Sequence, residues 1–505
     1  MTAARPRTRG SEHLWVTLAV VAAVVARAFV FVWWEQASFD SDQAVTGLMA
    51  KHLSEGRAFP LFFYGQNYLL AVQAWMAAPV FLALGPTVLA LKLPLLALNI
   101  GTALLLVRVL ERDTGLRPAL AALAASFFVL APPGTSGQLM SALGVSVEPF
   151  LYVLLIWVLR ERPIWQGVVL GLGFLHREFT AYGFAALLIV EACDRRLFTR
   201  RRVASAGLAL AAAAGMLAVV WLIRPYSSGA GPGTTPADVA GAANNLSGIL
   251  DRVCGEPGLV ARGLLTLVGS YLGLPLGLTP VDVSDFMVNT RMRQGAPWLW
   301  PIFGVGCLAG LWRLSWLVRR RDAAVPSGAL AFPGYLFIVG LIAALAYDVG
   351  RCGDLHVLTV RYVLLAILAP VGLSAAWLRV EPARGVRRGL VIALSAWALL
   401  STVGHVRLVD EYVRRRPPAY RRELADYLVA HHVHLARGDY WTGYHVSFLA
   451  QERVVFATDG VWRVLQYQHR VDAQPRSTYL VSRHPCPSEG AEAVANVYWV
   501  CDPPE

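Results

Sequence analysis

The sequence predicts a mainly α-helical protein that crosses a membrane many times and ends in a small α/β domain. Of the 505 residues, 56% are hydrophobic and 15% are charged, and the mean hydropathy is +0.50. Soluble domains carry about 25% charged residues. The apolar residues gather in runs of roughly 20, the length that a helix needs to cross about 30 Å of hydrocarbon. From about residue 411 onward the composition becomes that of a soluble domain.

The apolar runs predict about 11 membrane helices, two of them a broken or re-entrant pair. The first run is too long for the apolar part of a secretion signal, contains Arg27 and lacks a small-residue cleavage site. We therefore expect it to be retained as a helix. The single helices are predicted at 14–34, 88–110, 118–133, 143–160, 204–223, 298–318, 328–347, 362–379 and 389–407.

The broken pair is predicted within residues 163–193. Both ends of this stretch carry charges of the kind found on the cytoplasmic side of a membrane. One straight helix would place His176, Arg177 and Glu178 near the bilayer centre, where an arginine costs about 2.5–3.5 kcal/mol. Two short helices that meet at these residues avoid that cost and bring the three polar side chains toward the outer face.

The net charge of +12 comes largely from arginines that flank the predicted helices, and it does not indicate a nucleic-acid partner. By the positive-inside rule, these arginines place the N-terminus in the cytoplasm, and an odd number of crossings places the C-terminus outside it. The expected location is a bacterial inner membrane. The expected domains are a membrane domain over 1–410, with external loops at 35–86 and 224–296, and an extracytoplasmic α/β domain over 411–505.

The first external loop is predicted to contain two amphipathic helices beside the membrane, and the second, at 67–85, is expected to lie in or along the interface. Residues 44–56 carry Leu48, Met49 and Leu53 on one helical face, and residues 67–85 are more apolar.

The C-terminal domain is predicted from a helix that follows Pro417 and from strand-like runs at 453–457, 478–482 and 496–501. Cys486 and Cys501 fall in this domain, and Cys254 and Cys352 fall in external loops. An oxidising compartment allows either pair to form a disulfide, but the sequence does not decide the pairing.

Asp40 and Asp42 directly follow the first predicted helix and are the leading catalytic candidates. A carboxylate at an outer membrane surface can accept a proton from an attacking hydroxyl without being buried in hydrocarbon. The alternative is structural, with Ser41 or Asp42 capping the helix that starts near Gln43. The two interpretations are compatible, because a capping aspartate can also be catalytic.

An acidic step after the first helix, two helices beside the membrane and a Tyr64-Gly65-Gln66 step between them resemble the GT-C membrane glycosyltransferases. The sequence is most similar to the branch that holds protein O-mannosyltransferases, lipid A aminoarabinose transferases and rhizobial lipopolysaccharide sugar transferases. The resemblance covers roughly 14–407, with its best local matches at 39–66, 88–95 and 360–370.

The resemblance implies a reaction and a base. These families use a polyprenyl-phosphate sugar donor outside the cytoplasm, usually with inversion, and no nucleotide sugar. For this chain we expect no cofactor besides the lipid-linked sugar. Their Asp-Glu pair falls on Asp42-Gln43, which implies Asp42 as the base. Gln43 stands where the family has Glu, which puts a role for a second carboxylate in doubt. Asp40 is the residue that could substitute for it.

Arg361 and Tyr362 resemble an Arg-Tyr step found at the outer start of the corresponding family helix. Arginine offers a planar donor fork for a phosphate, and tyrosine favours the interface; the alternative is a plain interfacial anchor. Arg177 is the second phosphate-binding candidate, because an ionisable cluster with His176 and Glu178 at membrane depth indicates function. Its alternative is a local Arg177–Glu178 ion pair at a helix break.

Lys92 resembles a basic residue at the start of a family helix, where it either contacts a lipid phosphate or snorkels to the head groups. Tyr64 and Gln66 either hydrogen-bond a sugar or shape a turn. The aromatic run at 439–444 either stacks on a sugar or forms the core of the small domain. The histidines at 431–434 have no accompanying ligand set, so we expect no metal site.

The sequence thus predicts a glycosyltransferase that acts at the outer membrane face on a lipid, glycan or protein acceptor of the cell envelope. Arg361, Arg177 and Lys92 would hold the phosphate of the polyprenyl-linked donor, and Asp42 would deprotonate the acceptor. One alternative is a glycolipid transporter or flippase, which should show polar residues inside several helices and internal symmetry. The other is a non-catalytic envelope assembly protein, which should tolerate loss of Asp42.

Overall fold

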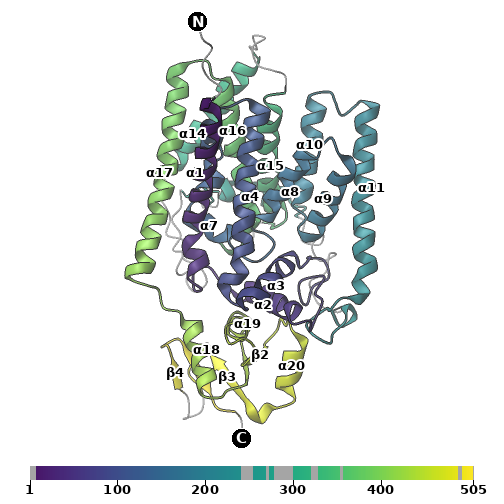
Figure 1. Ribbon diagram of the computed structural model, residues 1–505, viewed down its shortest axis with the longest axis vertical. Coiled ribbons are helices and arrows are strands. Elements are labelled where there is room, and N and C mark those ends of the chain that lie inside the picture. Colours follow the sequence, from purple (N-terminus) through teal and green to yellow (C-terminus); the bar gives the residue numbers. More distant parts are fainter. Residues whose placement is uncertain are drawn as a thin grey trace.

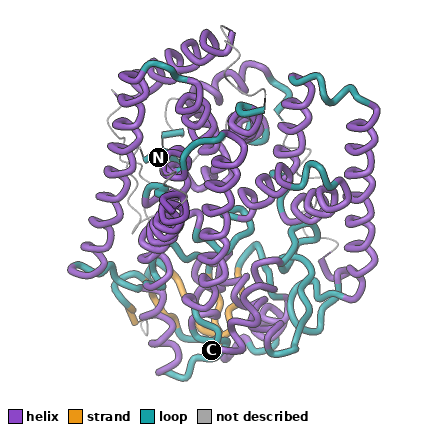
Figure 2. Tube along the Cα trace, turned by 45° about the horizontal axis from the view of Figure 1, so that its top comes forward, coloured by secondary structure: helices purple, strands orange, loops and turns teal. Residues whose placement is uncertain are grey.

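The computed structural model consists of a helical bundle and a small α/β unit at the end of the molecule opposite the N-terminus (Figure 1). In the described part of the chain, the strands lie near the C-terminus (Figure 2). The structure describes residues 7–239, 254–268, 272–273, 275–277, 299–319, 328–352, 357–486 and 492–503.

Six helical segments of the described chain are long and apolar enough to cross a membrane, which confirms a polytopic helical membrane protein. These segments are Gly10–Trp33, Val88–Thr114, Arg200–Tyr226, Ala331–Val349, Arg361–Val380 and Arg384–Arg414. The helices in them are α1 (Arg7–Trp33), α4 (Val88–Thr114), α11 (Arg200–Ile223), α15 (Ala331–Val349), α16 (Leu368–Val380) and α17 (Arg384–Arg414). The expected total of about 11 membrane helices stays a prediction.

Arg27 shows how a charge is accommodated inside an apolar helix. It lies in α1 and is almost fully buried against α4, where its Nη2 donates to Asn99 Oδ1 at 2.7 Å. Its guanidinium also lies 5.5 Å from the centre of the Phe128 ring. Charged side chains at membrane depth normally face the bundle interior and find polar partners there.

The predicted break within 163–193 is confirmed: α9 (Pro163–His176) and α10 (Thr180–Cys193) are separated at Arg177. The predicted helix at 118–133 is wrong as a single element. It is interrupted at Ala125 between α5 (Pro118–Ala124) and α6 (Ser126–Val129).

Two further elements complete this part of the bundle, α7 (Pro133–Leu139) and α8 (Glu148–Val158). The segment at 362–379 starts as a 3-10 helix, η4 (Val357–Ile367), before α16. The bundle also contains α14 (Leu299–Arg319), which precedes α15 in the chain.

The first external loop forms α2 (Ser41–Ser54) and α3 (Val72–Leu84), which lie between the bundle and the C-terminal unit (Figure 1). The expectation that residues 44–56 form an amphipathic helix is wrong, because α2 is buried on all its faces from Gln43 to His52. The C-terminal unit packs on α2 through Tyr440–Leu449. At Gly47 a Cβ atom would lie 2.5 Å from the Phe448 ring, so only glycine allows this approach.

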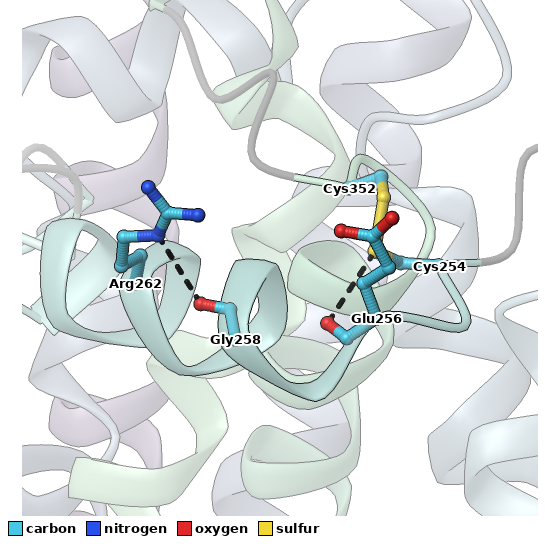
Figure 3. Close-up of a disulfide and its surroundings, with 5 residues drawn as sticks. All are labelled: Cys254, Glu256, Gly258, Arg262 and Cys352. Atoms are coloured by element: carbon cyan, nitrogen blue, oxygen red, sulfur yellow. Dashed lines mark hydrogen bonds between the residues drawn. A yellow bond between two sulfur atoms is a disulfide. The ribbon is translucent and has the colours of Figure 1, made fainter.

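The second external loop is described only in part. It contains η1 (Arg224–Tyr226), η2 (Pro236–Val239) and α13 (Pro257–Thr266). Residues 240–253 and 278–296 of the predicted loop lie outside the described residues. A disulfide joins Cys254, just before α13, to Cys352, just after α15 (Figure 3). It ties the loop to the segment that leads into η4.

The C-terminal unit is an α/β structure with a five-stranded sheet in the order β2-β1-β3-β5-β4. Strand β1 pairs in parallel with β2 and β3, whereas β5 pairs antiparallel with β3 and β4. Cys486 and Cys501 form its disulfide. In chain order its elements are α18 (Tyr420–Ala430), β1 (Leu435–Gly438), α19 (Tyr440–Leu449), β2 (Val455–Thr458), α20 (Leu465–Asp472), η5 (Pro475–Ser477), β3 (Thr478–Ser482), β4 (Glu492–Val494) and β5 (Tyr498–Cys501).

Glu452 of the C-terminal unit joins it to the end of α2. Its carboxylate pairs with Lys51, with His52 Nε2 at 2.9 Å and with Arg57 Nη1 at 2.7 Å. The Tyr467 hydroxyl donates to the same carboxylate at 2.8 Å. Burial alone would raise the pKa of Glu452, but the hydrogen bonds from His52 and Arg57 hold that pKa well below its usual range. The carboxylate is therefore ionised at any physiological pH.

A second contact is made at the start of the loop. Arg422 forms a bidentate pair with Glu35, with both N···O distances at 2.7 Å. Ser41 donates to the carbonyl of Trp441 at 2.7 Å, and Gln36 donates to the carbonyl of Pro417 at 3.1 Å. The C-terminal unit is thus held to α2 at both of its ends.

Replacing Glu452 with Gln should weaken this docking. The change removes the buried charge that Lys51, His52 and Arg57 share and leaves Lys51 and Arg57 paired with Glu55 alone. Breaking a buried ion pair typically costs about 3–5 kcal/mol, and the remaining pairs with Glu55 make the loss here smaller. We expect a lower Tm in detergent and faster hydrogen exchange within α2. Glu423→Gln, an exposed change in α18, is the matched control. Equal Tm values for the two variants would contradict the docking role.

Candidate active site

Asp40 caps α2, and Asp42 is left free for other contacts. Asp40 Oδ1 accepts from the backbone N–H of Gln43 at 2.9 Å, and the Asp40 side chain is buried. The expectation that Ser41 or Asp42 caps this helix is therefore wrong by one or two positions. Asp42 lies in the first turn with 16% of its side chain exposed.

The two carboxylate oxygens of Asp42 face different partners. Oδ1 accepts from the Tyr440 hydroxyl at 2.6 Å, and Oδ2 lies 3.8 Å from Arg361 Nη1. Tyr440 begins α19 in the C-terminal unit, and Arg361 lies on η4 of the bundle. Three segments far apart in the sequence therefore meet at one carboxylate.

Arg463 extends this cluster from the loop before α20. Its Nε donates to the Tyr440 hydroxyl at 3.3 Å, and its guanidinium lies 5.2 Å from the centre of the Phe63 ring. The side chain is buried, and the backbone N–H of Arg463 donates to the Tyr444 hydroxyl at 2.5 Å. This arrangement fixes a second arginine close to Asp42 through one intervening hydroxyl.

Arg177, at the break between α9 and α10, lies on the same side of the site. Arg361, Arg177 and Arg351 all place positive charge near the Tyr362 hydroxyl. Arg351 lies 4.7 Å and Arg361 lies 5.2 Å from the centre of the Tyr362 ring. Burial raises the pKa of Tyr68 in the first loop, and the positive charges of Arg177 and Arg463 oppose that rise. The charge of the cluster is thus mostly positive around Asp42.

Arg177 and Arg361 each retain unused hydrogen-bonding capacity. The Nε atom of each is buried without a partner among the described residues. Arg177 Nη2 makes only a long contact to the carbonyl of Leu143 at 3.5 Å. Buried donors are nearly always satisfied in folded proteins, so two unsatisfied guanidinium donors in one cluster indicate a place for an anionic ligand.

The other residues of the predicted 176–178 cluster separate from Arg177. His176 is buried, with Nδ1 2.9 Å from the Tyr152 hydroxyl, and it packs against Gly144. A Cβ atom at Gly144 would lie 2.6 Å from His176 Nε2, so His176 fills the helix break. Glu178 is half-buried, and the ion pairs of the described chain do not include Arg177 with Glu178.

Lys92 and Tyr64 hold the surroundings of the site together. Lys92 does not snorkel: it is fully buried, and its Nζ donates to the carbonyls of Ala37 and Ser38 at 3.1 Å each. The hydroxyl of buried Tyr64 lies 3.1 Å from His52 Nδ1, within the contact that holds Glu452.

Gln66 and Gln43 also lie close to these segments. Gln66 is half-buried, and its Oε1 has no hydrogen-bond partner in the described part of the chain. Gln43, which departs from the family pattern, donates to the carbonyl of Ser38 at 3.0 Å and accepts from Ala142 N–H at 3.1 Å. Gln43 therefore links two loops and does not face Asp42.

Sequence reasoning missed Tyr440, Arg463 and Glu148. Tyr440 falls in the aromatic run at 439–444, but the sequence does not show which residue of that run contacts Asp42. Arg463 stands alone in a loop and gives no signal. Glu148 begins α8, is buried and accepts from Gln73, while its Oε2 has no partner among the described residues. The carboxylates of Asp40 and Asp42 were predictable because they follow a membrane helix directly.

No protein-family model matches the chain, and no curated protein matches it by sequence. Among solved structures it is similar to ArnT from Cupriavidus metallidurans bound to undecaprenyl phosphate, with a TM-score of 0.57 and 13% identity over 96% of this chain and 97% of that one. The same protein in the apo state gives a TM-score of 0.41 at 13% identity, with the same coverage. ArnT is the lipid A aminoarabinose transferase. The likeness to the bound form shows that this chain has the GT-C fold that the sequence predicted.

Proposed function

We propose that this protein is a GT-C-type membrane glycosyltransferase that uses a polyprenyl-phosphate sugar donor. The observation that carries the proposal is the carboxylate of Asp42, which does not cap α2 and is held between Arg361 and Tyr440, beside two guanidinium Nε atoms without a partner among the described residues. The fold adds support, because the ArnT structure of the same fold was solved with undecaprenyl phosphate bound.

The proposed reaction is a single displacement at the anomeric carbon. Asp42 accepts the proton of an acceptor hydroxyl, and the hydroxyl oxygen forms a bond to the anomeric carbon. The bond between that carbon and the donor phosphate breaks, and its electron pair leaves with polyprenyl phosphate. Arg361 and Arg177 offset the charge that develops on the leaving phosphate. One displacement inverts the configuration of the sugar.

Tyr440 and Arg463 are proposed as positioning residues. The Tyr440 hydroxyl donates to Asp42 Oδ1, which leaves Oδ2 to face Arg361 and the substrates. Arg463 in turn holds the Tyr440 hydroxyl. In this proposal the C-terminal unit completes the site, so loss of its docking should also disturb Asp42.

The acceptor is proposed to be a component of the cell envelope, reached outside the cytoplasm. The separation of the N-terminus from the C-terminal unit supports a site on the side opposite a cytoplasmic N-terminus (Figure 1).

Metal independence also stays a prediction, which excess chelator in a transfer assay would test. The flippase and assembly alternatives remain distinguishable by chemistry, since neither requires a carboxylate that accepts a proton.

Asp42→Asn should abolish most transfer without loss of the fold. The amide keeps the size of the side chain but cannot act as a base, and loss of a general base typically costs roughly 10²-fold or more in rate. The measurement is the amount of glycosylated product, by mass spectrometry, in a deletion strain that expresses each variant. Asp502→Asn, an exposed change near the C-terminus, is the control. Full transfer by Asp42→Asn would remove this base from the mechanism.

Arg361 should be sensitive to geometry as well as to charge. Arg361→Lys keeps the charge but loses the planar fork, so we expect partial activity with a raised KM for the donor. Arg361→Ala should be nearly inactive. The double variant Arg361→Ala with Arg177→Ala should be no less active than the less active single variant, because both arginines serve one phosphate. Arg262→Ala on α13 is the control, and unchanged donor affinity in Arg361→Ala would reduce Arg361 to an anchor.

Asp40→Asn should change how stability depends on pH. Burial, and secondly the charge of Asp42, raises the pKa of Asp40 to about 6. The folded state therefore holds this proton more tightly than the unfolded chain, and the stabilisation is lost as the pH rises through about 6. The neutral Asn keeps the cap. The Tm of Asp40→Asn minus that of wild type should therefore be larger at about pH 8 than at about pH 4. A Tm difference that does not vary with pH would contradict the burial of a titrating Asp40.

A further inference from the structure

We propose that the end of the bundle opposite the candidate active site binds the head group of an anionic phospholipid. A cavity of about 420 Å³ opens there among helix ends. Its wall is formed by the C-terminal ends of α4, α8, α10 and α16 and by the starts of α11 and α15. In Figure 1 this end lies at the top, next to the N-terminus and far from the C-terminal unit.

The cavity contains more positive charge than its own acidic residues neutralise. Asp113 pairs with Arg112 at 2.6 Å and with Arg160 at 3.9 Å, and it also accepts from the indole of Trp157 at 2.6 Å. Glu191 pairs with Arg202. These pairs take up the charges of Asp113 and Glu191 and leave neither for the two remaining arginines of the lining.

Those remaining arginines are Arg196 and Arg379. In the described part of the chain neither has an acidic partner within 4.0 Å, and the buried Nε of Arg379 has no hydrogen-bond partner. The third acid of the lining, Asp194, makes no ion pair among the described residues, so five arginines face three acids and a net positive charge is left over. An arginine with an unpartnered Nε, in a cavity that a second arginine also lines, is suited to a phosphate group.

The surroundings favour a lipid over a free anion. Leu187 and Val190 of α10 also line the cavity, which gives apolar wall beside the arginines. Large apolar side chains near the same end are exposed, with Phe198 at 76% and Trp165 at 62%. Aromatic residues of this kind lie at the level of the lipid head groups. A basic pocket between helix ends at that depth is where anionic head groups bind.

The test uses the full-length protein in a neutral detergent and does not depend on transfer activity. Phosphatidylglycerol, phosphatidylcholine or inorganic phosphate is added, and bound lipid is counted by native mass spectrometry while Tm is recorded. We expect phosphatidylglycerol alone to bind and to raise the Tm. Arg196→Gln with Arg379→Gln should lower its affinity roughly tenfold or more, as expected for two arginine contacts.

Arg384→Gln with Arg388→Gln is the matched control, because these arginines are exposed at the start of α17, at the same end of the bundle. The control should bind phosphatidylglycerol like wild type. Arg196→Gln alone, at an exposed position, should lose part of the affinity even if the double variant fails to fold. Equal loss in the control, equal binding of phosphatidylcholine, or an equal effect of inorganic phosphate would each overturn the proposal.

Discussion

Charged side chains cannot be left unpaired in hydrocarbon, and this constraint decides where the polar residues of the chain lie. Arg27 is tolerated inside α1 because Asn99 on α4 accepts from it. Arg177 is kept out of a continuous helix because the chain breaks between α9 and α10. Two clusters of charged side chains lie at the two ends of the bundle. One end is covered by the C-terminal unit, and the other carries the arginine-lined cavity.

The candidate site is made by contacts between segments that are distant in sequence. Asp42 comes from the first loop, Arg361 from η4, and Tyr440 and Arg463 from the C-terminal unit. Glu452 and Arg422 hold that unit on α2, and the Cys254–Cys352 disulfide ties a loop to the chain before η4. Because no single segment contains the site, its geometry depends on the docking of the whole C-terminal unit.

The sequence allowed most of the fold to be predicted, because apolar runs and the cost of a buried arginine are local signals. They indicated the membrane helices and the break beside Arg177. The position of the helix cap was predicted less well, since Asp40, Ser41 and Asp42 are all suitable capping residues. The burial of α2 could not be predicted, because it depends on a unit encoded about 400 residues later. The same reason hid Tyr440 and Arg463, whose partners lie in another part of the chain.

The central claim is that a lipid phosphate binds beside Asp42, between the bundle and the C-terminal unit. The most direct measurement is a cryo-electron microscopy map of the protein in lipid nanodiscs with added polyprenyl phosphate. We expect phosphate density within hydrogen-bonding distance of Arg361 and Arg177, next to the Asp42 carboxylate. Density for the head group at a place that none of these side chains can reach, with only solvent beside Asp42, would contradict this placement.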